Sequence, residues 1–475
     1  MTYTLNHSGV TIADALAAEG ISFAHPCGGK GKCGKCRVHA VGALSEPTAN
    51  ERTLCDIAGG WRLSCEAVCL GEVTVTLPDS GSITAAMGKD THIALDPPLP
   101  GRYGAAIDIG TTTIAARRVD LVTGDVLSAA TARNPQSAYG ADVVSRIEFA
   151  LNSTAPLTDC IRTALRGLFD APIDAAVITG NTAMLHFLCG LSTDGMACAP
   201  FTPSELFGRT AVIDDLPFGR IYLPPCMSAF VGADITTAIL ASGMLADESA
   251  LLVDIGTNGE MALWRDGKLT CASTAAGPAF EGAEISSGVQ GIPGAIDSVR
   301  WDGEKLTYTT IQSAPPCGIC GSGLISAVAA LLDSGILDES GYLAEPIEIG
   351  DSGITLDPTD IRKLQLAKSA IRAGIDTLAA DGDISRFYLA GGFGSYLDID
   401  ACIRIGLLPE WVRGKLASIG NAALTGAEMI LKNRDCLHRA EELAKSATLL
   451  SLEDNERFCE LYIENMLFGK ETDYD

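Results

Sequence analysis

Three cysteines fall within ten residues near the start of the chain, in the segment HPCGGKGKCGKC, and a fourth follows at a distance. The spacing is Cys27-x5-Cys33-x2-Cys36, with 28 residues between Cys36 and Cys65. Four cysteine thiolates, three of them close together and one remote, are typical ligands of a 2Fe–2S cluster. Glycines between the cysteines allow the backbone to wrap closely round an inorganic core. The segment therefore predicts an iron–sulfur centre.

The spacing alone leaves other ligand sets open. Zinc also takes four cysteines, but usually from two CxxC pairs, and this segment holds only one. Cys55 and Cys69 compete with Cys65 for the fourth position. His25 could ligate iron as in a Rieske centre, although such centres need two histidines. The basic residues around the cysteines form either a solvated loop or a docking face for an acidic partner; they are Lys30, Lys32, Lys35 and Arg37.

Two copies of Asp-Ile-Gly-Thr offer a second kind of chemistry. They lie in AAIDIGTTTIAA and LLVDIGTNGEMA, where Asp108 and Asp254 are 146 positions apart. In each copy an apolar strand ends in a carboxylate that suits Mg²⁺, and the turn that follows can direct N–H and hydroxyl groups at phosphate. Gly-x-x-x-x-Gly-Lys-Ser/Thr does not occur in the sequence, which excludes a P-loop enzyme. The pair predicts a phosphate site built from two halves.

A second, weaker similarity between two segments supports an internal duplication. The segments at 176–181 (AVITGN) and 387–394 (FYLAGGFG) each end a strand in glycine before an expected helix. Both pairs of similar segments occur in the same order over similar distances, which indicates duplicated lobes and not short solenoid repeats. We expect the boundary near 245–249, with one lobe at 102–248 and the other at 249–475.

The N-terminal part reads as a small separate unit over 1–78. We expect a strand at 2–6, a turn at 7–9, a return strand at 10–12 and a helix at 13–19. Alternation in GEVTVTLP predicts a half-buried strand at 73–77. Residues 79–101, rich in Pro, Gly, Ser, Thr and Asp, are expected to form a flexible linker that lets the unit swing.

Composition limits the partners and the compartment. A chain of 475 residues that is 47% hydrophobic can fill two or three cores. Its net charge of −25 argues against a general nucleic-acid binder. The start has no basic region before an apolar core, and no run reaches the ~18 uncharged apolar residues of a membrane span. We therefore expect a cytoplasmic protein, away from membranes, with mostly reduced cysteines.

Both halves resemble known families. CGGKGKCGKC in a β-rich frame resembles a ferredoxin of the β-grasp fold, and WRLSCEA is similar to the fourth-ligand segment of adrenodoxin-like ferredoxins, which favours Cys65. The paired Asp-Ile-Gly-Thr loops resemble the phosphate loops of the actin-like ATPase superfamily. The expected fold class is α/β multi-domain, with a β-grasp ferredoxin followed by a two-lobed, ribonuclease H-like duplicated, actin-like ATPase domain.

The superfamily resemblance implies a role for each site residue. Asp108 and Asp254 would organise Mg²⁺ and the attacking water, and Glu281 in AAGPAFEGAEI would assist, unless it is only a helix-start carboxylate. Cys317 and Cys320 could form a redox dithiol or a bridging cluster, or they could mark a tight turn at a helix start. The residues expected to bind ATP are Gly110, Thr111, Thr112, Thr113, Gly256, Thr257, Asn258, Gly321, Gly391, Gly392 and Phe393, the last three in a GGFG segment that resembles the adenosine loop.

Over 1–78 and about 102–470 the chain resembles the reductive activators of corrinoid proteins. Segments such as VDIGTNGEMAL, CGICGSGLI and LAGGFGSYLDI carry this likeness. It implies ATP-dependent transfer of one low-potential electron from a 2Fe–2S cluster held by Cys27, Cys33, Cys36 and Cys65 to Co(II), regenerating Co(I). The expected partners are a corrinoid protein of a methyltransferase system, a low-potential electron donor and a second copy in a homodimer.

One feature departs from the family pattern. Many members have a further domain between the ferredoxin and ATPase parts, where this chain has only the short linker. Two alternatives follow from the residues alone. They are a small-molecule kinase gated by the cluster and a redox scaffold that nucleotide switches without turnover.

Overall fold

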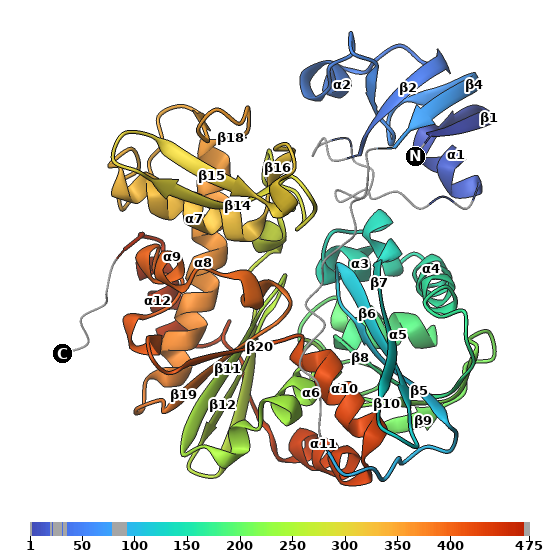
Figure 1. Cartoon of the computed structure of the whole chain (residues 1–475), viewed down its shortest axis with the longest axis vertical. Coiled ribbons are helices and arrows are strands. Elements are labelled where there is room, and N and C mark those ends of the chain that lie inside the picture. Colours follow the sequence, from blue (N-terminus) through green and yellow to red (C-terminus); the bar gives the residue numbers. More distant parts are fainter. Residues whose placement is uncertain (1, 20, 22–30, 32–35, 78–92, 470–475) are drawn as a thin grey trace.

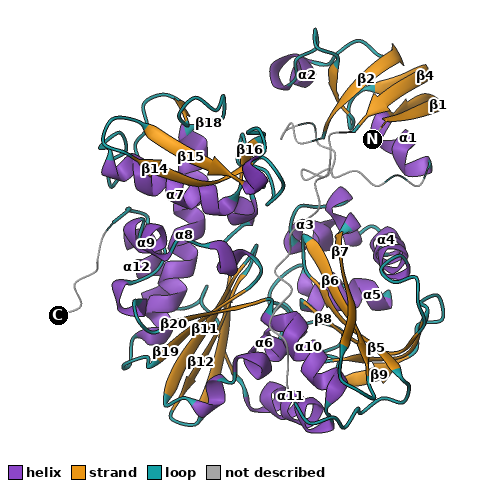
Figure 2. Ribbon diagram, in the orientation of Figure 1, coloured by secondary structure: helices purple, strands orange, loops and turns teal. Residues whose placement is uncertain are grey.

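The computed structural model describes residues 2–19, 21, 31, 36–77 and 93–469. A small sheet near the N-terminus lies at one end of the molecule, and two larger sheets lie side by side with helices around them (Figures 1 and 2). This is the α/β multi-domain architecture that the sequence predicts.

The N-terminal unit is an antiparallel sheet with one helix packed on it. Its strands lie in the order β1-β4-β2-β3. Leu16 of the helix packs into a core with Leu5, Val38 and Val73 from three of the strands. The elements are β1 (Thr2–Thr11), α1 (Ile12–Ala18), β2 (Arg37–Leu44), α2 (Ala49–Leu54), β3 (Trp61–Leu63) and β4 (Val68–Thr76).

The expected hairpin at 2–12 is wrong, because β1 is one continuous strand. It pairs along its length with β4, which begins at Val68, well before the predicted strand start at Val73. Gly9 has φ +82° and lies where the register shifts between Ser8 and Thr11, so it makes a bulge and not a reversal. The helix begins where expected, since Thr11 caps α1 by accepting from the N–H of Asp14.

The first large sheet occupies residues 103–223. Its order is β7-β6-β5-β8-β10-β9. The first three strands form an antiparallel meander, and β8 and β10 continue the sheet in parallel. The elements here are β5 (Tyr103–Ile109), β6 (Thr113–Asp120), β7 (Val126–Arg133), α3 (Val143–Ala150), α4 (Ala155–Arg166), β8 (Ile173–Gly180), α5 (Thr182–Cys189), β9 (Arg209–Ala211), β10 (Phe218–Leu223) and α6 (Ala233–Ser242).

The second large sheet has the order β20-β19-β11-β12-β13-β21, with the small sheet β15-β14-β16 beside it. Its elements, and those that surround it, are β11 (Ser249–Ile255), β12 (Gly259–Arg265), β13 (Lys268–Thr274), β14 (Ala295–Trp301), β15 (Leu306–Thr310), β16 (Gly318–Ile319), α7 (Gly321–Asp333), β17 (Ile347–Glu348), β18 (Thr355–Leu356), α8 (Pro358–Ala379), β19 (Arg386–Ala390), α9 (Ile399–Arg404), β20 (Leu416–Gly420), α10 (Ala422–Lys432), α11 (Arg434–Ser446), β21 (Thr448–Leu450) and α12 (Glu456–Glu464).

The two large sheets share one topology. In the second, β11, β12 and β13 form the meander, and β19 and β20 follow in parallel, as β8 and β10 do in the first. Both Asp-Ile-Gly-Thr segments end the equivalent central strands, β5 and β11. The structure thus has the internal repeat that the two pairs of similar segments in the sequence suggest.

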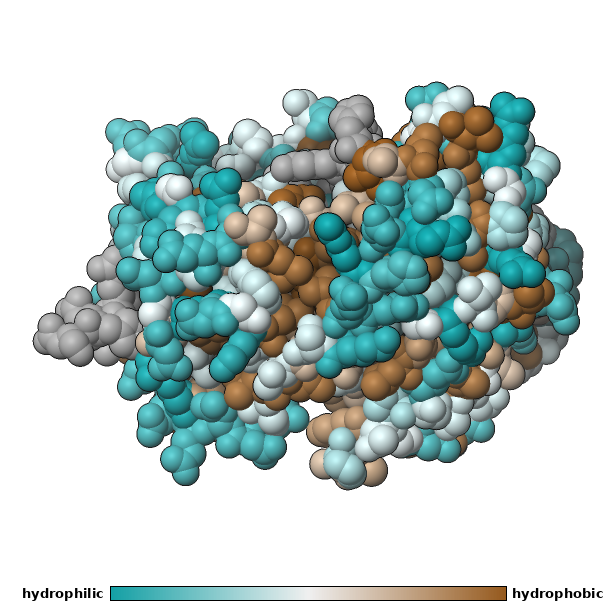
Figure 3. Space-filling view, turned by 90° about the horizontal axis from the view of Figure 1, so that it is seen from below, coloured by the Kyte–Doolittle hydropathy of each residue, from teal (hydrophilic) through white to brown (hydrophobic). Residues whose placement is uncertain are grey.

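Helices α6 and α10 fill the space between the two sheets. One hydrophobic core contains Val177 of the first sheet, Ile239 of α6, Leu424 of α10 and Leu252 of the second sheet. From below, hydrophobic residues reach the surface in the centre, between the two halves, while hydrophilic residues cover much of the rest (Figure 3). The halves therefore meet through a shared apolar layer, and the end of the second half packs on the sheet of the first.

A buried charge network reinforces this contact. Glu428 of α10 is fully buried and pairs with Arg117 of β6 at 2.6 Å and with Lys432 at 2.5 Å. Two cations around one carboxylate compensate the cost of taking it out of water. The network ties α10 to the first sheet specifically.

Part of the expected linker is fixed in place. The backbone of Asp96 pairs with α10 and α11, donating to the carbonyl of Lys432 and accepting from the N–H of Arg434, both at 2.9 Å. Asn433 donates to the carbonyl of Ala94 at 2.9 Å. The segment that leads into the first large sheet is thus held at the junction of α10 and α11, two helices that come much later in the chain.

Candidate nucleotide cleft and cluster site

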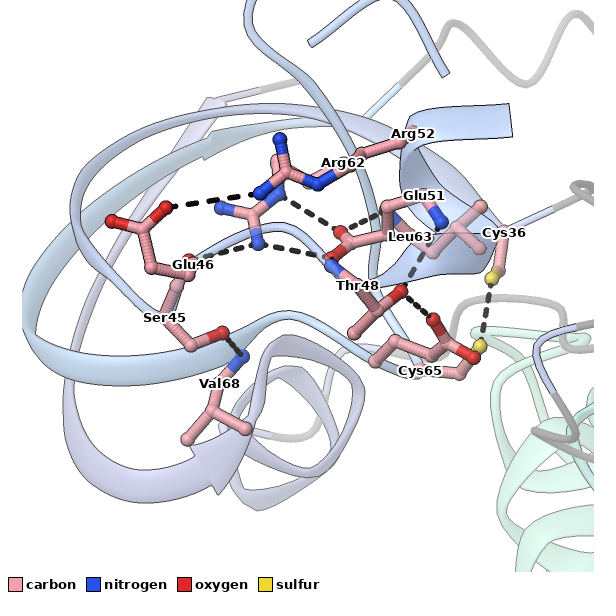
Figure 4. A network of polar contacts seen from close by, with 11 residues as sticks. Cys36, Ser45, Glu46, Thr48, Glu51, Arg52, Arg62, Leu63, Cys65 and Val68 are labelled. Atoms are coloured by element: carbon pink, nitrogen blue, oxygen red, sulfur yellow. Dashed lines mark hydrogen bonds and ion pairs between the residues drawn. The ribbon is translucent and has the colours of Figure 1, made fainter. Parts of the chain in front are cut away.

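Cys36 and Cys65 face each other in the N-terminal unit (Figure 4). Their sulfurs are 3.2 Å apart, longer than the ~2.05 Å of a disulfide, so the pair consists of two thiols that one metal could bridge. Cys36 directly precedes β2, and Cys65 lies between β3 and β4. Cys27 and Cys33 lie outside the described residues, as do Lys30, Lys32 and Lys35.

The two competing cysteines are placed less favourably. Cys69 lies on β4 inside the hydrophobic core of the unit, and burial raises the pKa of its thiol. Cys55 follows α2, where burial raises its pKa to about 11. A ligand must lose its proton to bind metal, which burial opposes at both Cys55 and Cys69, whereas the Cys65 sulfur lies next to that of Cys36. The arrangement favours Cys65.

A buried ion pair supports the segment that carries Cys65. The carboxylate of Glu51 accepts from Arg62 Nε at 2.8 Å and from the N–H groups of Leu63 and Thr48 at 3.0 and 2.9 Å (Figure 4). Burial alone would raise the pKa of Glu51, but these hydrogen bonds and the arginine charge lower it below its usual value. The N–H of Ser64 donates to the carbonyl of Cys36 at 2.9 Å, which joins the supported segment to the other cysteine.

Gly31 shows why glycine is needed in the cysteine loop. Its φ is +67°, and a Cβ there would lie 1.8 Å from Oε1 of Glu66. Glu66 is itself fixed by a 2.7 Å hydrogen bond from Asn50 and by a second one from Thr48. No side chain fits at this position without moving that carboxylate.

The nucleotide candidates come together in one cavity of about 900 Å³, which is lined by residues of both halves. It contains both Asp-Ile-Gly-Thr loops, the expected glycines after β19 and the first residue of α7. Phe393 follows Gly392 and begins the next short turn. The predicted residues that line the cavity are Asp108, Gly110, Thr111, Thr112, Thr113, Asp254, Gly256, Thr257, Asn258, Glu281, Gly321, Gly391 and Gly392.

Each phosphate-loop candidate is a tight turn at a strand end. The N–H of Gly110 donates to the carbonyl of Thr113 at 3.0 Å, and the N–H of Gly256 donates to the carbonyl of Asn258 at 3.3 Å. The turns reverse β5 into β6 and β11 into β12 at the same edge of their sheets. Ligands of open α/β sheets bind outside this carboxyl edge.

Glu281 connects the two loops. Its carboxylate accepts from the hydroxyl of Thr257 at 2.8 Å and also from the hydroxyl of Thr112, 169 positions away. The residue ends a short turn at Pro278–Glu281. Its main contacts are these two hydroxyls, which the alternative of a helix-start carboxylate does not explain. Glu281 holds together two loops that belong to different halves.

The aspartates at the strand ends repel one another. Burial and the charge of Asp254 raise the pKa of Asp108 to about 7, against the opposing effect of a 3.0 Å hydrogen bond from Asn421. Burial also raises the pKa of Asp254 to about 7, helped by Asp234 and Glu281.

Sequence reasoning missed several residues of this cavity. Asp234 lies in the first turn of α6, and burial together with the charge of Asp108 raises its pKa to about 7. Asn181 donates to Glu260 at 3.2 Å, and Asn421 caps α10. A signal existed for both asparagines, because each follows a glycine at a strand end and caps the next helix. Glu260, within β12, carried no such signal.

The surroundings of Cys317 and Cys320 argue against a redox dithiol. The two residues between them form β16, which pairs with β14. Extended backbone separates residues i and i+3 by about 10 Å, beyond the ~7 Å limit between Cα atoms for a disulfide. Cys317 is exposed, whereas Cys320 is buried and precedes α7. Cys320 lies at a helix start, as expected, but the residues before it are extended and form no tight turn.

Family models match most of the chain. The matches are to the 2Fe–2S iron–sulfur cluster binding domain over 2–70, the middle region of the activator RACo over 103–247 and the C-terminal ASKHA (actin-like) domain of RACo over 248–474. Together with the two sites, these matches define a protein that joins a 2Fe–2S ferredoxin domain to an actin-like ATPase domain.

Individual relatives make the family specific. The corrinoid activation enzyme RamQ of Eubacterium limosum is 32% identical over 77% of this chain and 70% of its own length. A [Co(II) methylated amine-specific corrinoid protein] reductase of Methanosarcina barkeri is 28% identical over 76% of each chain. A solved reductive activator for corrinoid, iron–sulfur protein is 28% identical, covers 98% of both chains and superposes with a TM-score of 0.72. The chain belongs to the family of reductive activators of corrinoid proteins.

No helix within the described parts of the chain is both long and apolar enough to cross a membrane.

Proposed function

We propose that this protein uses ATP to return a corrinoid protein from Co(II) to Co(I), one electron at a time. The observation that carries the proposal is the presence in one chain of a paired-cysteine site and a two-loop cleft, within a family of this activity. An electron source without a nucleotide cleft would be a ferredoxin, and a cleft alone would be a kinase or an ATPase. The combination matches an electron transfer that needs energy.

The proposed cluster ligands are Cys27, Cys33, Cys36 and Cys65. When bound, a 2Fe–2S cluster of this type supplies single electrons near −400 mV. Cys36 and Cys65 already face each other, and Gly31 leaves the space that a closely wrapped loop requires. Thiolate ligands need a reducing environment, so we infer a cytoplasmic location for the protein.

The cavity suits a nucleotide only as its metal complex. Seven of its described lining residues are acidic, and Lys, Arg and His are absent among them. A polyphosphate would therefore be repelled unless a cation accompanied it. No three His, Cys, Asp or Glu side chains in the described part of the chain form a ready-made metal cage. Mg²⁺ commonly keeps several waters and binds through substrate phosphates, which fits Asp108 and Asp254 as acceptors for those waters.

We assign the remaining lining residues by their position. Gly391 has φ +88°, and a Cβ there would lie 2.5 Å from Oδ1 of Asp254, so the backbone closely approaches the carboxylate. We infer that Gly391, Gly392, Phe393 and Gly321 bind the adenosine end. The phosphate ligands are the two turns, with Thr111, Thr112, Thr113 and Gly110 on one side and Gly256, Thr257 and Asn258 on the other.

Contacts across the cleft suggest how the nucleotide cycle changes the hold between the two halves. Glu281 holds hydroxyls of both loops, and these hydroxyls are the groups a phosphate would use. Nucleotide must therefore replace the carboxylate, and hydrolysis must restore it, so that each cycle changes how the halves are held. For a one-electron step each 59 mV uphill costs a factor of ten in the equilibrium, and this cycle can offset that cost.

The wider organisation is inferred in the same way. We assign residues 1–78 to the ferredoxin unit, 79–101 to its connection, and 102–248 and 249–475 to the two ATPase lobes. A low-potential donor must reload the cluster, and a homodimer is the expected assembly.

An anaerobic assay tests the proposal. Reduced protein, Mg-ATP and a candidate corrinoid protein are mixed, and the Co(II) and Co(I) absorption bands are followed over time. We expect Co(I) to accumulate only when all three are present and not when ATP is replaced by ADP. Cobalt reduction that does not depend on ATP, or ATP turnover that depends on a small acceptor instead, would contradict it.

A further inference from the structure

Arg146 places a buried positive charge directly behind the first phosphate loop. It lies on α3 and its side chain is 0% exposed. Nη2 donates to the carbonyl of Thr111 at 2.7 Å, Nε donates to the carbonyl of Gly140 at 3.0 Å, and Nη1 contacts the sulfur of Met184 at 3.6 Å. Thr111 lines the cavity, so the guanidinium supports the loop from the side opposite the nucleotide site.

This charge differs from the other buried arginines. Arg62, Arg117 and Arg372 pair with carboxylates at 2.8, 2.6 and 2.8 Å. Within the described part of the chain Arg146 forms no ion pair, and its partners are two carbonyls and a thioether. A buried cation that no carboxylate contacts directly costs free energy, and a folded protein keeps such a charge when the charge has a use.

The charge persists at neutral pH. Burial lowers the pKa of Arg146 to about 10, while the nearby carboxylates of Glu281 and Asp142 act against the shift. Glu281 is the residue that occupies the hydroxyls of both loops. When phosphate replaces that carboxylate, an anion remains in the same place, opposite the guanidinium.

The peptide bond transmits the orientation. A trans peptide is planar, with its C=O and N–H pointing in opposite directions. Because Arg146 holds the carbonyl of Thr111, the N–H of Thr112 points away from the guanidinium, and both threonines line the cavity. The guanidinium therefore fixes a peptide dipole whose positive end faces the nucleotide site.

We propose that Arg146 is a positioning residue for the nucleotide phosphates, acting through its charge and through the Thr111–Thr112 peptide. The inference rests on the proposed ATP site. It adds that the acidic cavity obtains part of its preference for polyphosphate from a cation that the nucleotide never touches.

Binding of adenosine, Mg-ADP and Mg-ATP by the full-length protein tests this inference. In Arg146→Met we expect Mg-ATP to bind about 10- to 100-fold more weakly, the range for a hydrogen bond to a charged group. The affinity for Mg-ADP should fall less than that for Mg-ATP, and the affinity for adenosine should not change. Arg146→Lys, which keeps the charge, should retain a ratio of ATP to adenosine affinity close to that of the wild type.

Arg162→Met is the matched control. Arg162 lies on α4 in the same half, donates to the carbonyl of Leu188 at 2.9 Å and pairs with Asp215, away from the cavity. Its replacement should leave all three affinities unchanged. Circular dichroism and thermal unfolding of each variant establish that it folds.

Several results would overturn the inference. Equal losses for all three ligands in Arg146→Met, or no loss, would show that phosphate charge is not involved. Arg146→Lys binding ATP as poorly as Arg146→Met would assign the effect to geometry alone. If Arg146→Met does not fold, a fall of the ATP-to-adenosine ratio in Arg146→Lys serves as the contradicting result. A wild-type protein that binds none of the three ligands refutes the ATP site itself, which is a distinguishable failure.

Discussion

The side-chain amide of Asn421 donates a 3.0 Å hydrogen bond to Oδ2 of Asp108, although the two residues are 313 positions apart. Asn421 also caps α10, by accepting from the N–H of Leu424 at 2.8 Å. The Asn421 side chain thus links the start of α10 to Asp108, the aspartate near the end of β5. It also stabilises the charged form of that aspartate, which burial disfavours.

Asn421→Ala should shift the acid limb of the ATPase pH profile to higher pH. The pKa of Asp108 is about 7 while Asn421 holds it down, so loss of the amide raises it further. If activity needs ionised Asp108, the variant loses activity at pH values where the wild type still works. A charged hydrogen bond predicts a shift of about one pH unit, measured as kcat/KM against pH.

Asn455→Ala is the control for this prediction. Asn455 caps α12 in the same manner, accepting from the N–H of Phe458 at 3.1 Å, but it does not line the cleft. Its loss should lower stability and leave the pH profile in place. An unchanged profile in Asn421→Ala would mean that Asp108 does not set the acid limb.

Asp254→Ala should abolish ATP hydrolysis and leave the cluster intact. The aspartate lines the cleft, and losing an electrostatic group of this kind typically costs about 100-fold or more in rate. Phosphate release and the visible spectrum of the cluster are measured on one sample. Substantial hydrolysis by the variant would remove Asp254 from the catalytic set, and loss of both signals would indicate misfolding.

Cys65→Ala and Cys69→Ala form a matched pair for the cluster. Cys65 contacts Cys36, whereas Cys69 is buried in the core of the same unit. We expect the first variant to lose the 2Fe–2S absorption and iron content. The second should keep both with a small loss of stability. A complete cluster in Cys65→Ala would transfer the ligand role elsewhere.

Glu51→Gln should destabilise the N-terminal unit by about 3–5 kcal/mol, because it leaves Arg62 buried without its counter-charge. The lowered pKa of Glu51 means that its contribution is complete above its ordinary value and is lost as pH falls through the lower folded value. The variant should therefore lose this acid dependence. Thermal unfolding between acidic and neutral pH measures both effects.

Glu46→Gln provides the comparison on the surface. Glu46 pairs with Arg52 at 4.0 Å, and its side chain is 96% exposed. An exposed pair of this kind contributes little, so the melting temperature should not change. Equal effects of the two substitutions would show that the Glu51 pair is not the support that its burial indicates.

Local sequence patterns were enough to predict the architecture and the types of residue at the two candidate sites. The repeated Asp-Ile-Gly-Thr segments predicted two related lobes because each is a strand, a turn and a strand in consecutive residues. The hairpin expected at 2–12 failed for a non-local reason. Gly9 permits a reversal, but β4 offers a partner for the whole strand, and that partner lies some sixty residues later.

The sequence by itself determined the cysteine spacing, the two loops and the order of the repeated strands, since these are properties of neighbouring residues. Only the tertiary structure decided that Glu281 holds both loops, that Asn421 reaches Asp108 and that Arg146 stands behind Thr111. Each of these contacts joins residues that are far apart in the chain. Such pairs leave no periodic signal, because their distance is set by how α3, α10 and the two sheets pack.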